Sequence, residues 1–145
     1  MSHSGAGGFR AIAFDIHIRA STEAVWSFLM DPDKIPRWHN YVRVDVDRPE
    51  VGGRFRFICG DSDPDDGGEI LELETNRKLS YRWSSSEPEA TVVEYHLEPQ
   101  GEYTKLSFKN SPFKEGPDWD KLYEADYRGW VDLTLKLKQA AEGQS

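Results

Sequence analysis

Apolar and polar residues alternate along most of this 145-residue chain, and spacings of three and four replace the alternation in only two places. Alternation is typical of strands with one buried face, whereas spacings of three and four are typical of amphipathic helices. We expect strands over residues 9–19, 41–47, 54–59, 69–74, 79–83, 91–97 and 104–108. Because the links between the later strands are short, the sheet is expected to be antiparallel.

Helical spacing follows the first strand and recurs at the end of the chain. Ser21 is suited to cap a short helix that runs to Leu29. Asp31-Pro32 is a typical start for a second short helix, which would end near Trp38. The apolar spacing over residues 119–137 predicts one long C-terminal helix covering the inner face of the sheet. The expected fold class is therefore α+β, with seven strands.

The charge balance argues against nucleic acid and membrane lipids as partners. Eighteen Lys and Arg residues oppose 26 Asp and Glu residues, which gives a net charge of −8. An acidic surface repels phosphate backbones and anionic lipid headgroups. We therefore expect neither nucleic-acid binding nor membrane insertion.

The N-terminus and the cysteine count suggest the domain limits and the compartment. Residues 1–8 are rich in Ser and Gly and lack a signal-peptide pattern, so we expect a disordered tail before a single domain over residues 9–142. Cys59 is the single cysteine. It alternates with Phe55 and Phe57 on the expected inward face of its strand, which predicts a buried, inert thiol. One cysteine excludes an intramolecular disulfide and favours a reducing compartment. We expect a cytoplasmic protein.

Aromatic side chains occupy the expected inward positions of the strands and of the long helix. Such side chains bury large areas and seldom fill space without gaps. They would either wall an apolar pocket or form a solid aromatic core. The candidate pocket residues are Phe55, Phe57, Tyr81, Trp83, Tyr95, Phe108, Tyr123 and Trp130.

Two carboxylates fall among these apolar positions. Glu69 shares its parity with Leu71 and Leu73, so it faces inward if they do and could act as an acid, a base or a ligand anchor. Alternatively, Ile70 faces inward and Glu69 is solvated. Asp126 lies on the apolar stripe of the long helix, where a buried carboxylate needs compensation. Its partner would be either a fixed side chain or a polar group of a ligand.

Other titratable residues carry weaker signals. His17 and His96 fall on outward strand positions and are expected at the surface. The acidic segment 61–68 has part of the Asp spacing of a calcium loop, but strands rather than helices flank it, so we expect a solvated hairpin loop. The sequence contains no recognisable catalytic motif. We therefore designate no catalytic residue and expect neither a metal nor a cofactor.

Several short segments occur together in a familiar order. They are Val25-Trp26, Asp31-Pro32, Arg37-Trp38, residues 51–57 (VGGRFRF), residues 68–72 (GEILE), residues 79–83 (LSYRW), and Gly129-Trp130 with Leu133 and Leu137. Over roughly residues 10–138 the chain resembles the START/Bet v 1-like (SRPBCC) superfamily, in the branch similar to the C-terminal domain of the heat-shock protein 90 ATPase activator. The resemblance implies a helix-grip fold, in which a curved seven-stranded sheet wraps around a long C-terminal helix and encloses a cavity.

The resemblance also implies a function, because members of the superfamily bind lipids, hormones or polyketides. Our leading hypothesis is a protein that holds a small apolar or amphipathic molecule in that cavity. Trp38 and His39 would lie near its mouth, although a surface histidine is the favoured interpretation of His39. One alternative is a cyclase or hydrolase that uses Glu69 or Asp126 with a tyrosine, and another is an interaction module for a chaperone. We expect a monomer or a weak homodimer.

Overall fold

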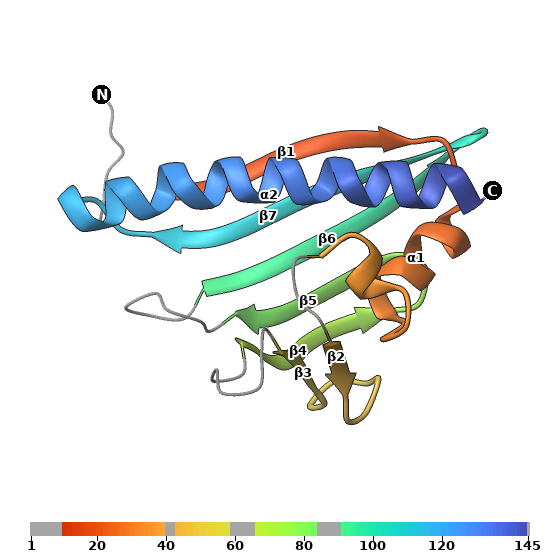
Figure 1. The fold of residues 1–145 in the computed structure, drawn as a ribbon, viewed down its shortest axis with the longest axis horizontal. Helices are drawn as coiled ribbons and strands as arrows, with labels where there is room; N and C mark the ends of the chain where they lie inside the picture. The colour runs from red at the N-terminus through yellow and green to blue at the C-terminus, as the bar shows by residue number, and fades with distance from the viewer. Residues whose placement is uncertain (1–9, 40–42, 59–65, 84–90, 145) are drawn as a thin grey trace.

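The computed structural model describes residues 10–39, 43–58, 66–83 and 91–144. Figure 1 shows the elements in chain order and their arrangement. They are β1 (Arg10–Ile18), α1 (Thr22–Met30), the 3-10 helix η1 (Ile35–Arg37), β2 (Arg43–Val46), β3 (Arg54–Ile58), β4 (Asp66–Glu74), β5 (Lys78–Trp83), β6 (Thr91–Gln100), β7 (Tyr103–Phe113) and α2 (Pro117–Gln144).

All seven strands form one antiparallel sheet in the order β1-β7-β6-β5-β4-β3-β2. The long helix α2 runs alongside β1 and β7, and the remaining strands curve away from it towards α1 and η1 (Figure 1). The predicted α+β class, the antiparallel seven-stranded sheet and the long C-terminal helix are confirmed.

The segment after β1 differs from the prediction in its second half. Ser21 caps α1 as expected, since its hydroxyl accepts a hydrogen bond of 3.1 Å from the backbone N–H of Ala24. The second helix, however, is only the three-residue η1. Asp31 ends α1, and its carboxylate also accepts a hydrogen bond of 2.9 Å from the backbone N–H of Asp33, as expected of a residue that begins the next turn. Pro36 has no N–H with which to continue an α-helical ladder, so this turn leads only into η1.

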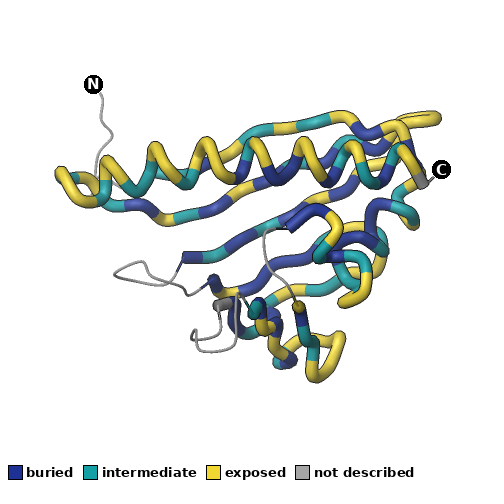
Figure 2. Tube along the Cα trace, viewed as in Figure 1, coloured by how far each residue is buried: buried dark blue, intermediate teal, exposed yellow. Residues whose placement is uncertain are grey.

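The packing of α2 changes along its length. Its apolar stripe is buried at Trp130, Leu133 and Leu137, whereas Trp119 and Tyr123 near its start are half-buried. In Figure 2 the buried part of α2 accordingly lies in its middle and C-terminal half. The N-terminal half of the helix is therefore held to the sheet by less contact than the rest.

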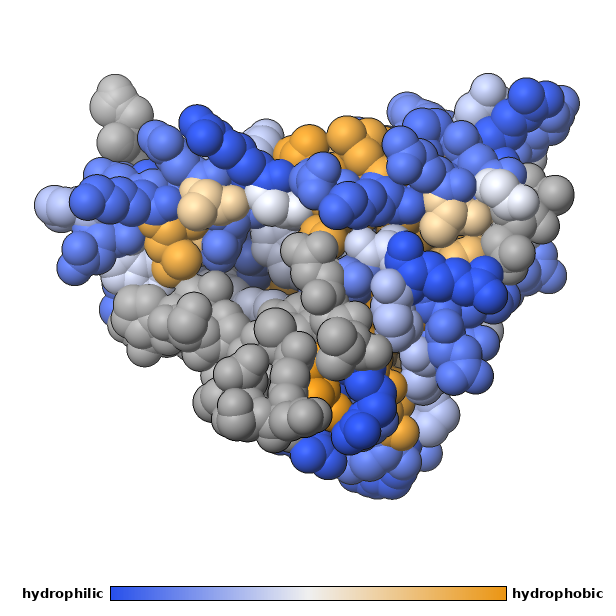
Figure 3. All heavy atoms as spheres, viewed as in Figure 1, coloured by the Kyte–Doolittle hydropathy of each residue, from blue (hydrophilic) through white to orange (hydrophobic). Residues whose placement is uncertain are grey.

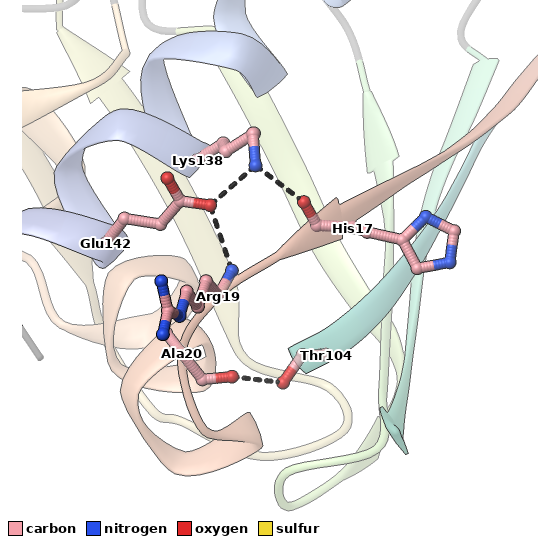
Figure 4. Close-up of polar contacts among 6 residues, drawn as sticks. All are labelled: His17, Arg19, Ala20, Thr104, Lys138 and Glu142. Atoms are coloured by element: carbon pink, nitrogen blue, oxygen red, sulfur yellow. Dashed lines mark hydrogen bonds and ion pairs between the residues drawn. The ribbon is translucent and has the colours of Figure 1, made fainter. Parts of the chain in front are cut away.

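A group of polar contacts fastens the C-terminal end of α2 to the end of β1 (Figure 4). The Lys138 ammonium donates a hydrogen bond of 2.8 Å to the backbone oxygen of His17 and pairs with Glu142. The same Glu142 carboxylate accepts a hydrogen bond of 2.9 Å from the backbone N–H of Arg19. We call these contacts the C-terminal clamp. They fix the end of α2 that is already the more deeply buried.

Candidate functional site

Six inward strand positions, the two residues after η1 and one residue of α2 bring nine aromatic rings together, in what we call the aromatic cluster. Its members are Trp38, His39, Phe55, Phe57, Tyr81, Trp83, Tyr95, Phe108 and Trp130, each at most 7% exposed. Ring contacts connect them without a break, with centroids from 4.8 Å apart for Phe108 and Trp130 to 6.4 Å for Tyr81 and Tyr95. Nine of the twelve predicted site residues therefore meet at one place.

Strand register explains why residues distant in sequence meet there. Tyr95 of β6 lies directly opposite Phe108 of β7, and their rings pack edge to face with centroids 5.4 Å apart. Cross-strand partners share one face of a sheet, so alternation carries both side chains to the inner face. Trp130 reaches the same place from α2, and its ring contacts Phe108 and Trp83.

His39 lies inside the cluster, and the expectation of a surface histidine is wrong. Its ring stacks on Phe57 with centroids 5.0 Å apart and meets Trp130 edge-on at 5.9 Å. Burial lowers the pKa of His39 from 6.5 to about 3, because a charged imidazolium loses its hydration there. The imidazole is therefore neutral at neutral pH. His17 and His96 are exposed, as predicted.

Trp38 fixes the chain on which His39 sits. Its indole N–H donates a hydrogen bond of 2.8 Å to the backbone oxygen of Phe28 in α1. This bond is buried and ties the residues after η1 to α1. The neighbouring His39 is thereby held over β3.

A small cavity opens among these rings. It is lined by Leu29, Ile35, Trp38, His39, Phe57, Tyr81 and Tyr95, and its volume is about 10 Å³. A space of that size holds about one water molecule. The lining contains neither a carboxylate nor a cationic side chain. This part of the cluster is closely packed, and a larger molecule enters only if the rings move apart.

Two tyrosine hydroxyls are buried beside this cavity. Burial raises the pKa of Tyr81, with the Tyr95 hydroxyl opposing part of the change. Burial also raises the pKa of Tyr95, and the neighbouring Tyr81 raises it further. The two hydroxyls lie close enough to affect each other's pKa, but the Tyr95 hydroxyl forms no hydrogen bond of ordinary geometry with any residue that the structure describes. An unpaired buried hydroxyl costs about 1–3 kcal/mol of stability, so this position needs an explanation.

A second buried polar group went unrecognised in the sequence. The indole N–H of Trp130 donates a hydrogen bond of 3.2 Å to the Asn110 side-chain oxygen. The Asn110 amide nitrogen donates to the Thr91 hydroxyl at 2.8 Å and to the backbone oxygen of Val92 at 3.1 Å. The predicted strand stopped at residue 108, but β7 runs to Phe113, so two further residues of alternation place Asn110 inward.

Glu69 does not lie on the inner face, so its prediction as an inward ligand anchor is wrong and the alternative, in which Ile70 faces inward, is confirmed. Glu69 pairs across the strands with Arg54, which is exposed, whereas Ile70 is fully buried. The register between β4 and β5 shifts after Ile70. The alternation of inward and outward side chains is interrupted there, so the orientation of Leu71 and Leu73 does not predict that of Glu69.

Glycines allow β4 to lie close to both of its neighbours just before this shift. A Cβ at Gly67 would lie 2.5 Å from the backbone oxygen of Phe55, and one at Gly68 would lie 2.3 Å from that of Arg82. Gly67 also has a φ of +112°, which side chains disfavour. These residues fall in the segment predicted as a hairpin loop, yet β4 already begins at Asp66.

Tyr123 and Asp126 lie on α2 but outside the aromatic cluster. Tyr123 packs edge-on against Phe113, and its hydroxyl donates a 3.3 Å hydrogen bond to the backbone oxygen of Ala11. The Arg10 guanidinium lies 4.7 Å from the centre of its ring. Asp126 is half-buried, one helical turn before Trp130. Neither residue lines the small cavity.

Some predictions concern residues outside the described part of the chain. Cys59 and residues 61–65 belong to this group, so the predictions of a buried thiol and of a metal-free loop stay predictions. Within the described ranges, no three His, Cys, Asp or Glu side chains gather as metal ligands would. No helix in those ranges combines the length and the apolar character that crossing a bilayer requires.

The chain matches a model of a known protein family. The sequence profile described as "Activator of Hsp90 ATPase homolog 1-like protein" matches residues 19–142. No curated protein matches the chain.

Solved structures share the fold over nearly the whole chain. Protein MLL2253 from Mesorhizobium loti is 27% identical, with a TM-score of 0.79 over 94% of this chain and 99% of its own. CalU16 from Micromonospora echinospora is 24% identical, with a TM-score of 0.75 over 94% of this chain and 77% of its own. The Aha1 dimer from Colwellia psychrerythraea is 23% identical, with a TM-score of 0.74 over 92% of this chain and 96% of its own. The last two show a likeness of fold alone.

Proposed function

Because the chain belongs to the activator of Hsp90 ATPase homolog 1-like family, whose Bet v 1-like fold commonly binds hydrophobic ligands, we propose that it binds a small apolar or amphipathic molecule between the sheet and α2. The observation that supports this proposal best is the aromatic cluster itself. Nine rings pack together there, and the Tyr95 hydroxyl lies beside a cavity without a hydrogen bond of ordinary geometry to any described residue.

Apolar burial supplies the affinity in this proposal. A ligand that buries about 200 Å² of apolar surface gains about 5 kcal/mol before ordering costs are subtracted. Since the cavity holds about 10 Å³, part of that gain is spent on separating the rings. We therefore expect modest affinity for general apolar probes and higher affinity for a ligand that also uses the polar groups.

The N-terminal half of α2 is the proposed entry side. Trp119, Tyr123 and Asp126 are only half-buried there, whereas the C-terminal clamp fixes the opposite end of the helix. Local openings come most easily where few apolar groups are buried. A small displacement of this half exposes the aromatic cluster while the clamp keeps α2 on the sheet. Asp126 would then meet a polar group of an entering ligand.

Ligand binding fits the site better than the cyclase or hydrolase alternative. An enzyme of that kind needs an acid or a base within hydrogen-bond reach of the reacting atom. No carboxylate lines the cavity, and Glu69 lies on the outer face of the sheet. The lowered pKa of His39 leaves its imidazole uncharged at pH 7, so this side chain is unsuited to act as a general acid there.

A second candidate function, contact with an Hsp90-type chaperone, is favoured by one surface feature. Tyr127, Val131 and Leu135 follow one another at spacings of four on α2, and Tyr127 and Leu135 are 36% and 45% exposed. Figure 3 shows apolar side chains at the surface along α2. Under this alternative, Leu135→Asp would abolish stimulation of the chaperone ATPase while leaving binding of apolar probes unchanged.

The proposed setting is a cytoplasmic monomer or weak homodimer. The relative from Colwellia psychrerythraea was solved as a dimer in solution. Sedimentation velocity over a hundredfold concentration range measures whether this chain self-associates. The effect of Leu135→Asp on that equilibrium shows whether the exposed row on α2 forms the contact.

Native mass spectrometry of the purified protein, followed by solvent extraction, tests the leading proposal. We expect one small molecule per chain, either copurified or taken up from added 2-ethylnaphthalene. Leu135→Asp is the matched control and should bind equally well, because Leu135 lies on the outer side of α2. A folded protein that takes up no apolar probe, yet stimulates the chaperone ATPase, would replace the leading proposal with the second.

A further inference from the structure

The Tyr95 hydroxyl differs from the buried serine, threonine and asparagine side chains of the described chain. The side chains of Ser80, Thr91, Thr104, Asn110 and Thr134 are all hydrogen-bonded. Tyr95 is 1% exposed, and its ring is held between Phe108 and Tyr81. Its hydroxyl lies near that of Tyr81 but forms no hydrogen bond of ordinary geometry with a described residue, and the side chain lines the cavity. A buried donor beside a space of one oxygen's size is arranged to receive an oxygen from a ligand.

The walls of the cavity determine which kind of oxygen fits. Its seven lining residues include no Lys, Arg, Asp or Glu. Burial keeps His39 neutral at neutral pH by lowering its pKa to about 3, and the raised pKa values of Tyr81 and Tyr95 keep both hydroxyls protonated. A carboxylate or an ammonium group would lose its hydration there and meet no opposite charge, which costs several kcal/mol.

We propose that the site selects uncharged amphipathic molecules, in which an apolar ring or chain carries a carbonyl or similar oxygen that accepts a hydrogen bond from the Tyr95 hydroxyl. This inference rests on the proposed function and names its class of ligand. The aromatic cluster holds the apolar body, and the Tyr95 hydroxyl orients the buried end. Aliphatic hydrocarbons lack the oxygen, and fatty acids carry a charge that the cavity does not balance.

Three probes of similar size separate these classes. They are 2-acetylnaphthalene, 2-ethylnaphthalene and 2-naphthoate, each titrated at pH 7 by calorimetry. The wild-type protein should bind the ketone about five- to tenfold more tightly than the hydrocarbon, the range expected for one buried neutral hydrogen bond. It should bind the naphthoate about tenfold or more weakly than the hydrocarbon, because the carboxylate must shed its water.

The variant Tyr95→Phe removes only the hydroxyl. We expect it to lose the ketone preference and to keep, or improve, its affinity for the hydrocarbon. Its melting temperature should not fall, since an unpaired buried hydroxyl is removed. Tyr103→Phe is the matched control, because Tyr103 is 42% exposed on β7, and it should keep the wild-type preference.

The outcomes distinguish a failure of this inference from a failure of the proposed function, the binding of an apolar molecule. If the wild-type protein binds the hydrocarbon and the ketone equally, or if Tyr95→Phe keeps the ketone preference, the inference is overturned while apolar binding stands. Tighter binding of the naphthoate than of the ketone overturns it without any variant. If none of the three probes binds, the proposed function fails and the inference fails with it.

Discussion

The indole N–H of Trp130 donates a hydrogen bond of 3.2 Å to the side-chain oxygen of Asn110, so that one buried amide joins α2 to β7. Asn110 is fully buried, and its nitrogen donates to Thr91 and to the backbone oxygen of Val92 on β6. A single side chain thereby connects the helix with two strands. Trp130 is held against Phe108 as a result, which fixes the side of the aromatic cluster that α2 contributes.

Replacement of Asn110 by Ala should destabilise the protein strongly. The change leaves the Trp130 N–H without its acceptor, and each unsatisfied buried polar group costs about 1–3 kcal/mol. We expect the free energy of unfolding in urea to fall by at least about 2 kcal/mol. Ser107→Ala, on the outer side of the same strand, is the control and should change it by less than about 0.5 kcal/mol. Equal effects of the two variants would show that the Trp130–Asn110 bond contributes little.

The buried His39 predicts a loss of stability in acid. Below about pH 6.5 the unfolded chain binds a proton on His39, whereas the folded protein does not do so until about pH 3. Stability therefore falls as the pH decreases through that range, and this residue contributes about 2 kcal/mol of the loss by pH 5. Urea unfolding at several pH values measures the effect.

The matching variant is His39→Phe, which keeps an aromatic ring and has no titratable group. Its free energy of unfolding should depend less steeply on pH between about 6.5 and 3 than that of the wild-type protein. The control His96→Gln replaces an exposed histidine and should keep the wild-type dependence. Parallel curves for His39→Phe and the wild-type protein would contradict the burial of a neutral imidazole.

Phe57 lines the cavity, so its truncation should lower the stability of the protein and raise its affinity for an apolar ligand. Phe57→Ala should lower the free energy of unfolding by about 3–5 kcal/mol, the usual cost of removing a buried ring. The space it leaves needs no further separation of rings, so the affinity for 2-ethylnaphthalene should rise. Calorimetry measures that affinity. Tyr103→Ala, which truncates an exposed ring, is the control. Unchanged or weaker binding by folded Phe57→Ala would place the ligand elsewhere.

The C-terminal clamp predicts a local effect on α2. Lys138→Met removes the hydrogen bond to the His17 backbone and the contact with Glu142, while keeping an apolar stem over the strand. Amide hydrogens in the last three turns of α2 should then exchange faster, with little change in global stability, because exposed ion pairs contribute about 1 kcal/mol or less. Lys136→Met is the control for the exposed pair with Asp132. Equal protection in both variants would mean that apolar packing alone holds this end.

Alternation of side chains was sufficient to predict the sheet and most of the aromatic cluster. A strand with one wet face shows its buried side directly, and this placed Phe57, Tyr95 and Phe108 correctly. The same reasoning failed at Glu69, because the register shift after Ile70 reverses the parity and leaves no mark in the spacing of apolar residues. It missed Asn110 because the predicted strand ended too early.

The burial of His39 and the size of the cavity could not be predicted from the sequence. His39 follows a 3-10 turn rather than a periodic element, and its position depends on the contact between Trp38 and α1. The cavity volume depends on how rings from β3, β5 and β6 interlock with Trp38, His39 and the side chains of α1 and η1, which pattern analysis does not address. Both features arise from tertiary packing.

The most direct test of the central claim is an NMR titration that observes the five tryptophan indole N–H signals. The probe is 2-acetylnaphthalene, added to the isotope-labelled protein at pH 7. Binding in the aromatic cluster should shift the signals of Trp38, which lines the cavity, and of Trp83 and Trp130, and it should saturate at one probe per chain with little change for Trp26 on α1. An unchanged spectrum at high probe concentration, or shifts confined to Trp26, would contradict a ligand site in the aromatic cluster.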